Sequence, residues 1–159
     1  MLGLDQVWWL VSPQNPLKPA KGMASLAERL AAARRVARHP RIKVTDLERR
    51  LGTRYTIDTV RRLLRQPDGT RFVWLMGADN LLQLPRWQRW TEIMRLMPIA
   101  VLDRRTPGPA LAGRAAQRFA NARLQPFQAR HLADRFPPAW VFLPIRRHPA
   151  SATAIREDN

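Results

Sequence analysis

Val7-Trp8-Trp9-Leu10-Val11 is an uninterrupted apolar run, rich in aromatic and β-branched residues, that ends at Ser12-Pro13. Runs of this kind are typical of strands buried on both faces, as the strands of a parallel sheet are. Residues 7–11 are therefore expected to form a buried strand. Further strands are predicted at residues 41–45, 72–76, 99–102 and 140–143, the first of these half-buried because its polar and apolar residues alternate.

Segments with helical periodicity separate these strands and predict helices at residues 23–38, 56–66, 80–84, 87–96 and 110–120. Ser25 and Glu28 have the spacing of a capping box, and Thr56 is expected to cap the second helix. Pro67-Asp68-Gly69 predicts a turn, and Pro107-Gly108-Pro109 is expected to break the chain. This alternation of strands and helices predicts an α/β fold with a mostly parallel sheet and right-handed crossovers.

The composition limits the classes of protein to which the chain can belong. It has 159 residues, no cysteine, 45% hydrophobic residues and a formal net charge of +16. The length suits one domain over residues 1–159, and the lack of cysteine excludes disulfides, thiolate zinc sites and a catalytic thiol. No apolar run is long enough to span a membrane and no secretion signal is recognisable, so we expect a soluble, cytoplasmic domain.

Arginine supplies most of the positive charge, since only Lys18, Lys21 and Lys43 of the 28 basic residues are lysine. Basic pairs are spread along the whole chain, whereas proteins that bind nucleic acid more often gather them on one face or tail. Solvated helix faces explain this pattern, and a positive field that attracts nucleotides is compatible with it. A non-enzymatic, arginine-rich nucleic-acid-binding protein stays an alternative, suggested by the charge and the six tryptophans.

Polar, basic and aromatic residues follow the predicted strands, on the side where ligands bind in parallel α/β sheets. Each of them has an ordinary explanation as a helix cap, a core residue or a surface charge. Together they suit a nucleotide: a carboxylate accepts from ribose hydroxyls, hydroxyls and free amides at a helix start bind phosphate, and an aromatic plane stacks on a heterocycle. The residues are Lys18, Thr56, Gly77, Asp79, Trp87, Ser151, Thr153, Ile155 and Arg156.

Six segments in order give the chain a specific resemblance to the nicotinate-nucleotide adenylyltransferases, a family of the nucleotidyltransferase superfamily with a Rossmann-like, doubly wound and mostly parallel sheet. No P-loop or G-x-G-x-x-G motif competes with this reading. The segments are Leu2-Gly3-Leu4-Asp5-Gln6-Val7-Trp8, Ser12-Pro13-Gln14-Asn15-Pro16-Leu17-Lys18, Tyr55-Thr56-Ile57-Asp58-Thr59, Gly77-Ala78-Asp79-Asn80-Leu81, Leu84-Pro85-Arg86-Trp87 and Ser151-Ala152-Thr153-Ala154-Ile155-Arg156.

The resemblance implies a role for each candidate residue. For nicotinate mononucleotide, it implies that the Thr56 amide binds the carboxylate, that Trp87 stacks on the pyridine ring and that Lys18 belongs to a basic phosphate-binding loop. Gly77 and Asp79 would hold the ribose of ATP. The ATP phosphates would be bound by Ser151, Thr153 and Arg156, with Ile155 beside the adenine.

The implied reaction is attack by the 5′-phosphate of nicotinate mononucleotide on the α-phosphorus of ATP, which releases pyrophosphate and forms deamido-NAD, a precursor in NAD biosynthesis. The attacking phosphate is already ionised, so no protein nucleophile is needed. Catalysis would rest on positioning and on charge neutralisation, with Mg²⁺ on the ATP phosphates. The same fold could serve another substrate, such as nicotinamide mononucleotide or phosphopantetheine, and a non-catalytic relative or a homo-oligomer is left open.

Members of the family begin with a central strand, a glycine-rich turn and a histidine-x-glycine-histidine motif that contacts the ATP phosphates. The three histidines here, His39, His131 and His148, do not have that spacing, so no catalytic residue is assigned. The first strand and helix of the doubly wound sheet are expected to be missing, which would leave residues 7–11 and 72–76 with one unpaired edge each. We therefore expect the 159-residue chain to be unstable and nearly inactive, and an upstream reading frame to encode the motif.

Overall fold

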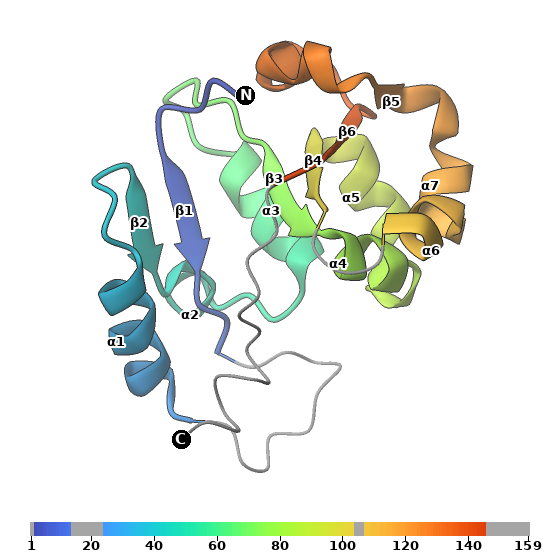
Figure 1. Cartoon of the computed structure of the whole chain (residues 1–159). Coiled ribbons are helices and arrows are strands. Elements are labelled where there is room, and N and C mark those ends of the chain that lie inside the picture. The colour runs from blue at the N-terminus through green and yellow to red at the C-terminus, as the bar shows by residue number, and fades with distance from the viewer. Residues whose placement is uncertain (1, 14–23, 104–106, 146–159) are drawn as a thin grey trace.

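A computed structural model gives the structure of the protein and describes residues 2–13, 24–103 and 107–145. Strands and helices alternate along these residues, as the sequence predicts (Figure 1). The strands are β1 (Val7–Leu10), β2 (Ile42–Thr45), β3 (Trp74–Gly77), β4 (Ile99–Leu102), β5 (Arg123–Leu124) and β6 (Trp140–Leu143). The α-helices are α1 (Leu26–Val36), α2 (Leu47–Leu51), α3 (Thr56–Leu64), α4 (Ala78–Gln83), α5 (Trp90–Leu96), α6 (Pro107–Ala112) and α7 (Arg114–Arg118). Three 3₁₀ segments, η1 (Leu84–Arg86), η2 (Ala120–Ala122) and η3 (Pro126–Asp134), complete the described part.

The strands form two sheets, and every strand pair in them is parallel. β1 pairs with β2, while β3, β4, β6 and β5 form a four-stranded sheet in that order. Figure 1 shows β1 and β2 to one side of the β3, β4 and β6 group. The predicted α/β fold with a parallel sheet is thereby confirmed.

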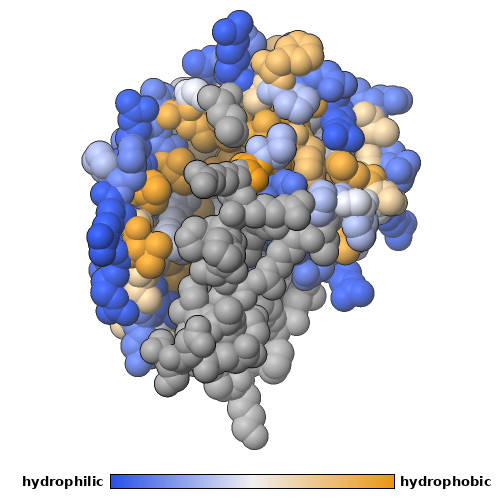
Figure 2. Space-filling view, viewed as in Figure 1, coloured by the Kyte–Doolittle hydropathy of each residue, from blue (hydrophilic) through white to orange (hydrophobic). Residues whose placement is uncertain are grey.

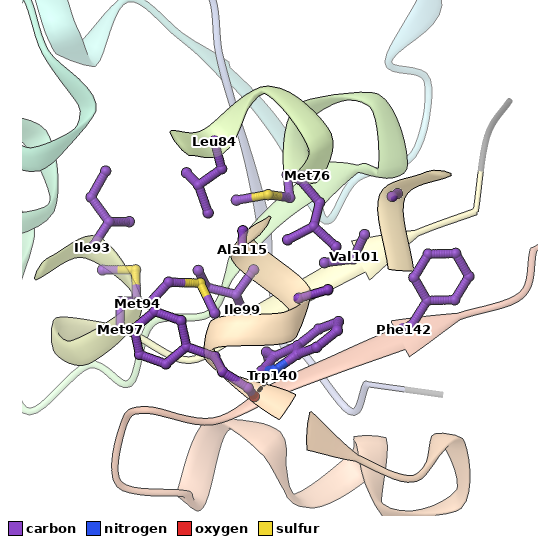
Figure 3. Close-up of a cluster of buried hydrophobic side chains, with 14 of the residues drawn as sticks. Met76, Leu84, Ile93, Met94, Met97, Ile99, Val101, Ala115, Trp140 and Phe142 are labelled. Atoms are coloured by element: carbon purple, nitrogen blue, oxygen red, sulfur yellow. Dashed lines mark hydrogen bonds between the residues drawn. The ribbon is translucent and has the colours of Figure 1, made fainter. Parts of the chain in front are cut away.

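The four-stranded sheet holds the core of the molecule. One face packs against α3 to α7 through the side chains of Met76, Ile99, Val101, Trp140 and Phe142 (Figure 3). The indole Nε1 of Trp140 donates to the carbonyl of Phe119 at 2.8 Å, which satisfies the one polar atom of this fully buried ring.

The opposite face of the same sheet packs against η3. Ala100, Val141 and Leu143 alternate along their strands with the residues of the first face, and they contact Ala129 and Leu132 of η3. Because successive side chains of a strand point to opposite faces, a strand with apolar residues at every position requires cover on both sides. β4 and β6 have that cover.

The two-stranded sheet is far less buried, and here the prediction of a fully buried first strand is wrong. Trp8 and Trp9 in the middle of β1 are 39% and 42% exposed. Within the described residues β1 pairs with β2 alone and β3 with β4 alone, so each has the unpaired edge that the sequence predicts. The Trp8 ring instead meets the ring of Phe72, just before β3, edge to face with centroids 5.8 Å apart.

Several local predictions are confirmed. Ser25 and Glu28 form the predicted capping box of α1, with the Glu28 side chain 2.7 Å from the Ser25 amide. Gly69 has a φ of +70°, and the Thr70 amide donates to Asp68, as expected of a turn. α1 and β2 lie at the left edge of the molecule in Figure 1, and Figure 2, viewed from the same side, shows hydrophilic side chains along that edge.

Other local predictions need correction. Tyr55, not Thr56, is the N-cap of α3, and Thr56 is the first residue of the helix. Pro107-Gly108-Pro109 was expected to break the chain before a helix at 110–120, but it forms the start of α6, since proline needs no intrahelical acceptor in the first turn, and α7 follows from Arg114. The sequence reasoning missed α2 and β5, because segments of five and two residues are too short to show a period. No helix of the described residues is long and apolar enough to cross a membrane.

Candidate functional site

A cavity of about 1490 Å³ is lined by β1 and by residues of β3. It follows β1 over its whole length because the edges of β1 and β3 that flank it are unpaired in the described part. Its volume therefore reflects the space between the two sheets and does not measure a ligand. Among the residues that line it, those with polar, charged or aromatic side chains that could contact a ligand include Ser12, Glu48, Arg54, Tyr55, Thr56, Asn80, Arg86 and Trp87.

Thr56, the first residue of α3, lines this cavity. The helix has nine residues, and its first amides, including that of Thr56, have no intrahelical acceptor. These amides and the positive end of the helix dipole suit an anion, such as a carboxylate. The correction of the cap strengthens this reading, because Thr56 as the first helical residue presents a free amide.

Trp87 lines the same cavity as Thr56. It follows η1, where its amide donates to the carbonyl of Leu84 at 2.8 Å, and its side chain is half-buried against the edge of the core. Part of the ring is therefore held by packing while another part borders the cavity. A rigid, partly open indole plane is suited to stacking on a flat heterocycle.

Gly77 and Asp79 lie at the carboxyl end of β3, where α4 begins. Gly77 is the last residue of the strand and the N-cap of α4, with an extended φ of −78°. The Oδ1 atom of Asp79 is buried and has no hydrogen-bond partner among the residues described. A buried acceptor without a donor is costly, and a bound hydroxyl group would satisfy it.

The structure brings some predicted site residues together, while the other predicted site residues lie outside the described part of the chain. Thr56 and Trp87 line one cavity, and Gly77 and Asp79 share the start of α4. The predicted roles of the remaining site residues are not tested, because these residues lie outside the described part of the chain. They are Lys18, Ser151, Thr153, Ile155 and Arg156.

Sequence reasoning missed two arginines at the cavity. Arg54 lies with its guanidinium carbon 5.6 Å from the centre of the Tyr55 ring, and Arg86 precedes Trp87. Both line the cavity and add positive charge to it, Arg54 next to the start of α3. Their adjacency to Tyr55-Thr56 and Trp87 was the available signal, but 28 basic residues spread over the chain concealed it.

Buried Glu48 was also missed. It is 8% exposed and accepts a hydrogen bond from the Ser12 hydroxyl at the end of β1. In the sequence it is one of several charged residues in an ordinary amphipathic stretch, and only the fold brings it to Ser12.

The described histidines do not contribute to the cavity. His39 accepts from the amide of Arg41, and His131 accepts from the Arg130 side chain; both are exposed. In the ranges described, no group of three acidic or histidine residues could hold a metal ion.

The fold is that of a parallel α/β protein with a cavity lined by β1, β3 and the start of α3, and comparison with known proteins identifies its family. The chain matches the cytidylyltransferase-like family over residues 1–158 and belongs to it. The parallel sheet with a ligand-binding end at the carboxyl termini of its strands agrees with a Rossmann-like nucleotidyltransferase.

Close relatives carry a more specific name. The chain is 52% identical to a probable nicotinate-nucleotide adenylyltransferase from Cereibacter sphaeroides over 157 residues, which are 97% of this chain and 82% of that protein. It is 53% identical to a protein of the same name from Parvibaculum lavamentivorans, over 98% of this chain and 78% of the relative. A third protein of that name, from Methylorubrum extorquens, is 52% identical over 98% of this chain and 84% of its own length.

Proposed function

We propose that this protein transfers the adenylyl group of ATP to nicotinate mononucleotide, giving deamido-NAD and pyrophosphate in NAD biosynthesis. The observation that carries the proposal is that the start of α3 at Thr56 and the half-buried ring of Trp87 line the same cavity. A pyridine ring that bears a carboxylate is matched by both an anion-binding helix start and a stacking plane. The names of the relatives support the same activity.

The reaction joins two substrates without a covalent enzyme intermediate. A 5′-phosphate oxygen of the mononucleotide forms a bond to the α-phosphorus of ATP, while the bond from that phosphorus to the oxygen bridging the β-phosphate breaks. Pyrophosphate leaves with the electron pair of that bond. The protein contributes by aligning the two phosphates and by offsetting negative charge, which positioned donors do well in a partly buried site.

The mononucleotide would occupy the cavity between α3 and Trp87. The Thr56 amide would bind its carboxylate, the Trp87 ring would stack on its pyridine, and Lys18 would bind its phosphate. Arg54 and Arg86 border the same space and would attract the charged substrate. Neutral nicotinamide would lack the anion that the helix start favours, which supports the acid as the substrate.

ATP would bind where β3 ends. The buried Oδ1 of Asp79 has no donor in the described structure, and a ribose hydroxyl would supply one, with Gly77 beside it. Ser151, Thr153 and Arg156 would bind the phosphates and Ile155 would lie beside the adenine. Mg²⁺ would be held on the triphosphate oxygens, where it would neutralise charge on the leaving pyrophosphate.

The test is a pyrophosphate-release assay with ATP, Mg²⁺ and either nicotinate or nicotinamide mononucleotide, using the protein translated from its full reading frame. We expect release with nicotinate mononucleotide and a much lower rate with the amide. Absence of release with both substrates would overturn the proposal. Equal rates would retain adenylyl transfer but reject the role of the α3 terminus in selecting the acid.

The stacking role is tested by replacing Trp87. Trp87→Ala should raise the KM for the mononucleotide by about 10-fold or more, the effect expected for loss of one stacked aromatic contact, with little change in the KM for ATP. Trp87→Phe is the matched control, because it keeps an aromatic plane and should retain most of the affinity. A rise in the KM for ATP alone would show that the two halves of the site have been assigned wrongly.

A further inference from the structure

We propose that Glu48 is a positioning residue for the mononucleotide half of the site, and that it acts by holding Ser12, at the end of β1, against the start of α3. The inference rests on the proposed function, because it assigns a role within the same site. It starts from the most buried carboxylate in the part of the chain that the structure describes.

Glu48 is 8% exposed and lines the cavity, yet it takes part in none of the ion pairs found among the described residues. Its Oε2 atom accepts the hydroxyl of Ser12. Burying a carboxylate without a paired cation lowers the stability of the folded protein. A purely structural need for packing at this position would be met at lower cost by an apolar side chain.

Glu48 and Arg29 together hold the end of β1 in place. Arg29 of α1 donates from its two terminal nitrogens to the main-chain oxygens of Ser12 and Pro13, at 2.6 and 2.7 Å. The guanidinium thus fixes the backbone, while Glu48 fixes the Ser12 side chain. Ser12 and Pro13 lead directly into residues 14–18, which include Lys18.

The backbone of Glu48 connects to α3. Its carbonyl accepts the amide of Thr53 at 2.9 Å, and the hydroxyl of Thr53 lies 2.8 Å from that of Thr59. Thr59 is completely buried in α3, one turn after Thr56. Glu48 is therefore the link between the end of β1 and the helix start that we assign to the nicotinate carboxylate.

The position of Glu48 predicts that its loss affects the binding of the mononucleotide and not of ATP. Ser12, Glu48 and Thr56 all line the cavity, whereas Gly77 and Asp79 do not, and Asn80 is the one residue of α4 that reaches it. Loss of the Ser12–Glu48 hydrogen bond would shift the end of β1 relative to α3 and leave the start of α4 in place. Mononucleotide binding should weaken while ATP binding is retained.

The test uses Glu48→Ala and Glu48→Gln in the protein that shows pyrophosphate release. Glu48→Ala should raise the KM for nicotinate mononucleotide about 10-fold, the size expected for one hydrogen bond to a charged group, without changing the KM for ATP. Glu48→Gln should stay close to wild type, because its amide oxygen still accepts from Ser12. Calorimetric titration with nicotinate mononucleotide should give a matching change in Kd.

A double-mutant cycle with Ser12→Ala separates this role from a loss of folding. If Glu48 acts through Ser12, Ser12→Ala raises the same KM, and the double variant Ser12→Ala/Glu48→Ala is no worse than either single variant. Additive effects, an equal rise in both KM values, or an unchanged mononucleotide KM in Glu48→Ala would each overturn the inference. Should Glu48→Ala fail to fold, Ser12→Ala alone decides: an unchanged mononucleotide KM rejects the link, and a selective rise supports it.

The outcome also separates this inference from the proposed function. If wild type neither binds nicotinate mononucleotide nor releases pyrophosphate, the function and the positioning role fall together. If wild type is active and the Ser12 and Glu48 variants are additive, the function stands and only the positioning role is rejected.

Discussion

β1 and β6 are made of almost the same residue types, yet they lie in very different surroundings. β1 reads Val-Trp-Trp-Leu and β6 reads Trp-Val-Phe-Leu. Trp140 of β6 is 1% exposed, whereas Trp9 of β1 is 42% exposed. Composition and strand length are therefore not what separates a core strand from a surface strand in this protein.

The difference follows from the number of neighbours. β6 lies between β4 and β5 and has helices or 3₁₀ segments on both faces, while β1 in the described chain has one strand neighbour and borders the cavity. Apolar residues set how much free energy burial can contribute, but neighbouring elements decide whether burial occurs. The four-stranded half should therefore provide most of the stability, and the two-stranded half should be the more adaptable side of the site.

The largest expected effect is the loss of stability in Trp140→Ala. This substitution removes a fully buried ring and its hydrogen bond to Phe119, and it should lower the free energy of unfolding by about 3–5 kcal/mol. Urea denaturation followed by circular dichroism would measure it. Trp9→Ala is the matched control in β1 and should cost no more than about 1 kcal/mol, because much of that ring is already in water. Similar losses in both variants would abolish the distinction between the two halves.

An intermediate effect is expected where the two halves meet. The Thr53–Thr59 hydrogen bond joins the loop after α2 to a buried position of α3. Thr59→Val should lower the free energy of unfolding by about 1 kcal/mol, since it removes one buried hydrogen bond at nearly constant volume. Thr53→Val combined with Thr59→Val should cost little more than the worse single variant, because both break the same bond. Strictly additive losses in denaturation experiments would show that the two hydroxyls do not interact.

The smallest effect concerns a half-buried ion pair that joins two helices of the four-stranded half. The hydrogen bond from Arg61 of α3, assisted by the charges of Arg61 and Arg89, holds the pKa of Glu92 below its ordinary value of 4.5. A lowered pKa means that this contribution is complete above pH 4.5 and is lost as the pH falls through the folded-state value. Wild type should thus be slightly more stable than Glu92→Gln near neutrality, and the two should converge in acid. Denaturation midpoints that differ equally at both pH values would contradict the ion-pair contribution.

The site shows how far local sequence information extends. Thr56 and Trp87 were predicted because each stands in a short motif after a strand, and parallel strands bring such positions to one edge of the sheet. Glu48 was missed because it stands in no motif and only the fold brings it to the cavity, whereas Arg54 and Arg86 adjoin Thr56 and Trp87 but were concealed among 28 basic residues. The orphan oxygen of Asp79 is likewise visible only in three dimensions, because hydrogen-bond satisfaction depends on all surrounding atoms.

Hydrophobic period and cap chemistry are local properties, so the alternation of strands and helices, the parallel direction of the sheet and the capping box of α1 could be predicted from the residues alone. The half-exposed state of Val7–Leu10, the burial of Trp140–Leu143 and the contact of Ser12 with Glu48, 36 residues away, became apparent only in three dimensions. The physical reason is that burial and hydrogen-bond pairing depend on neighbours distant in the sequence. A strand whose residues suit the core remains exposed where the described structure provides no partner for its other edge.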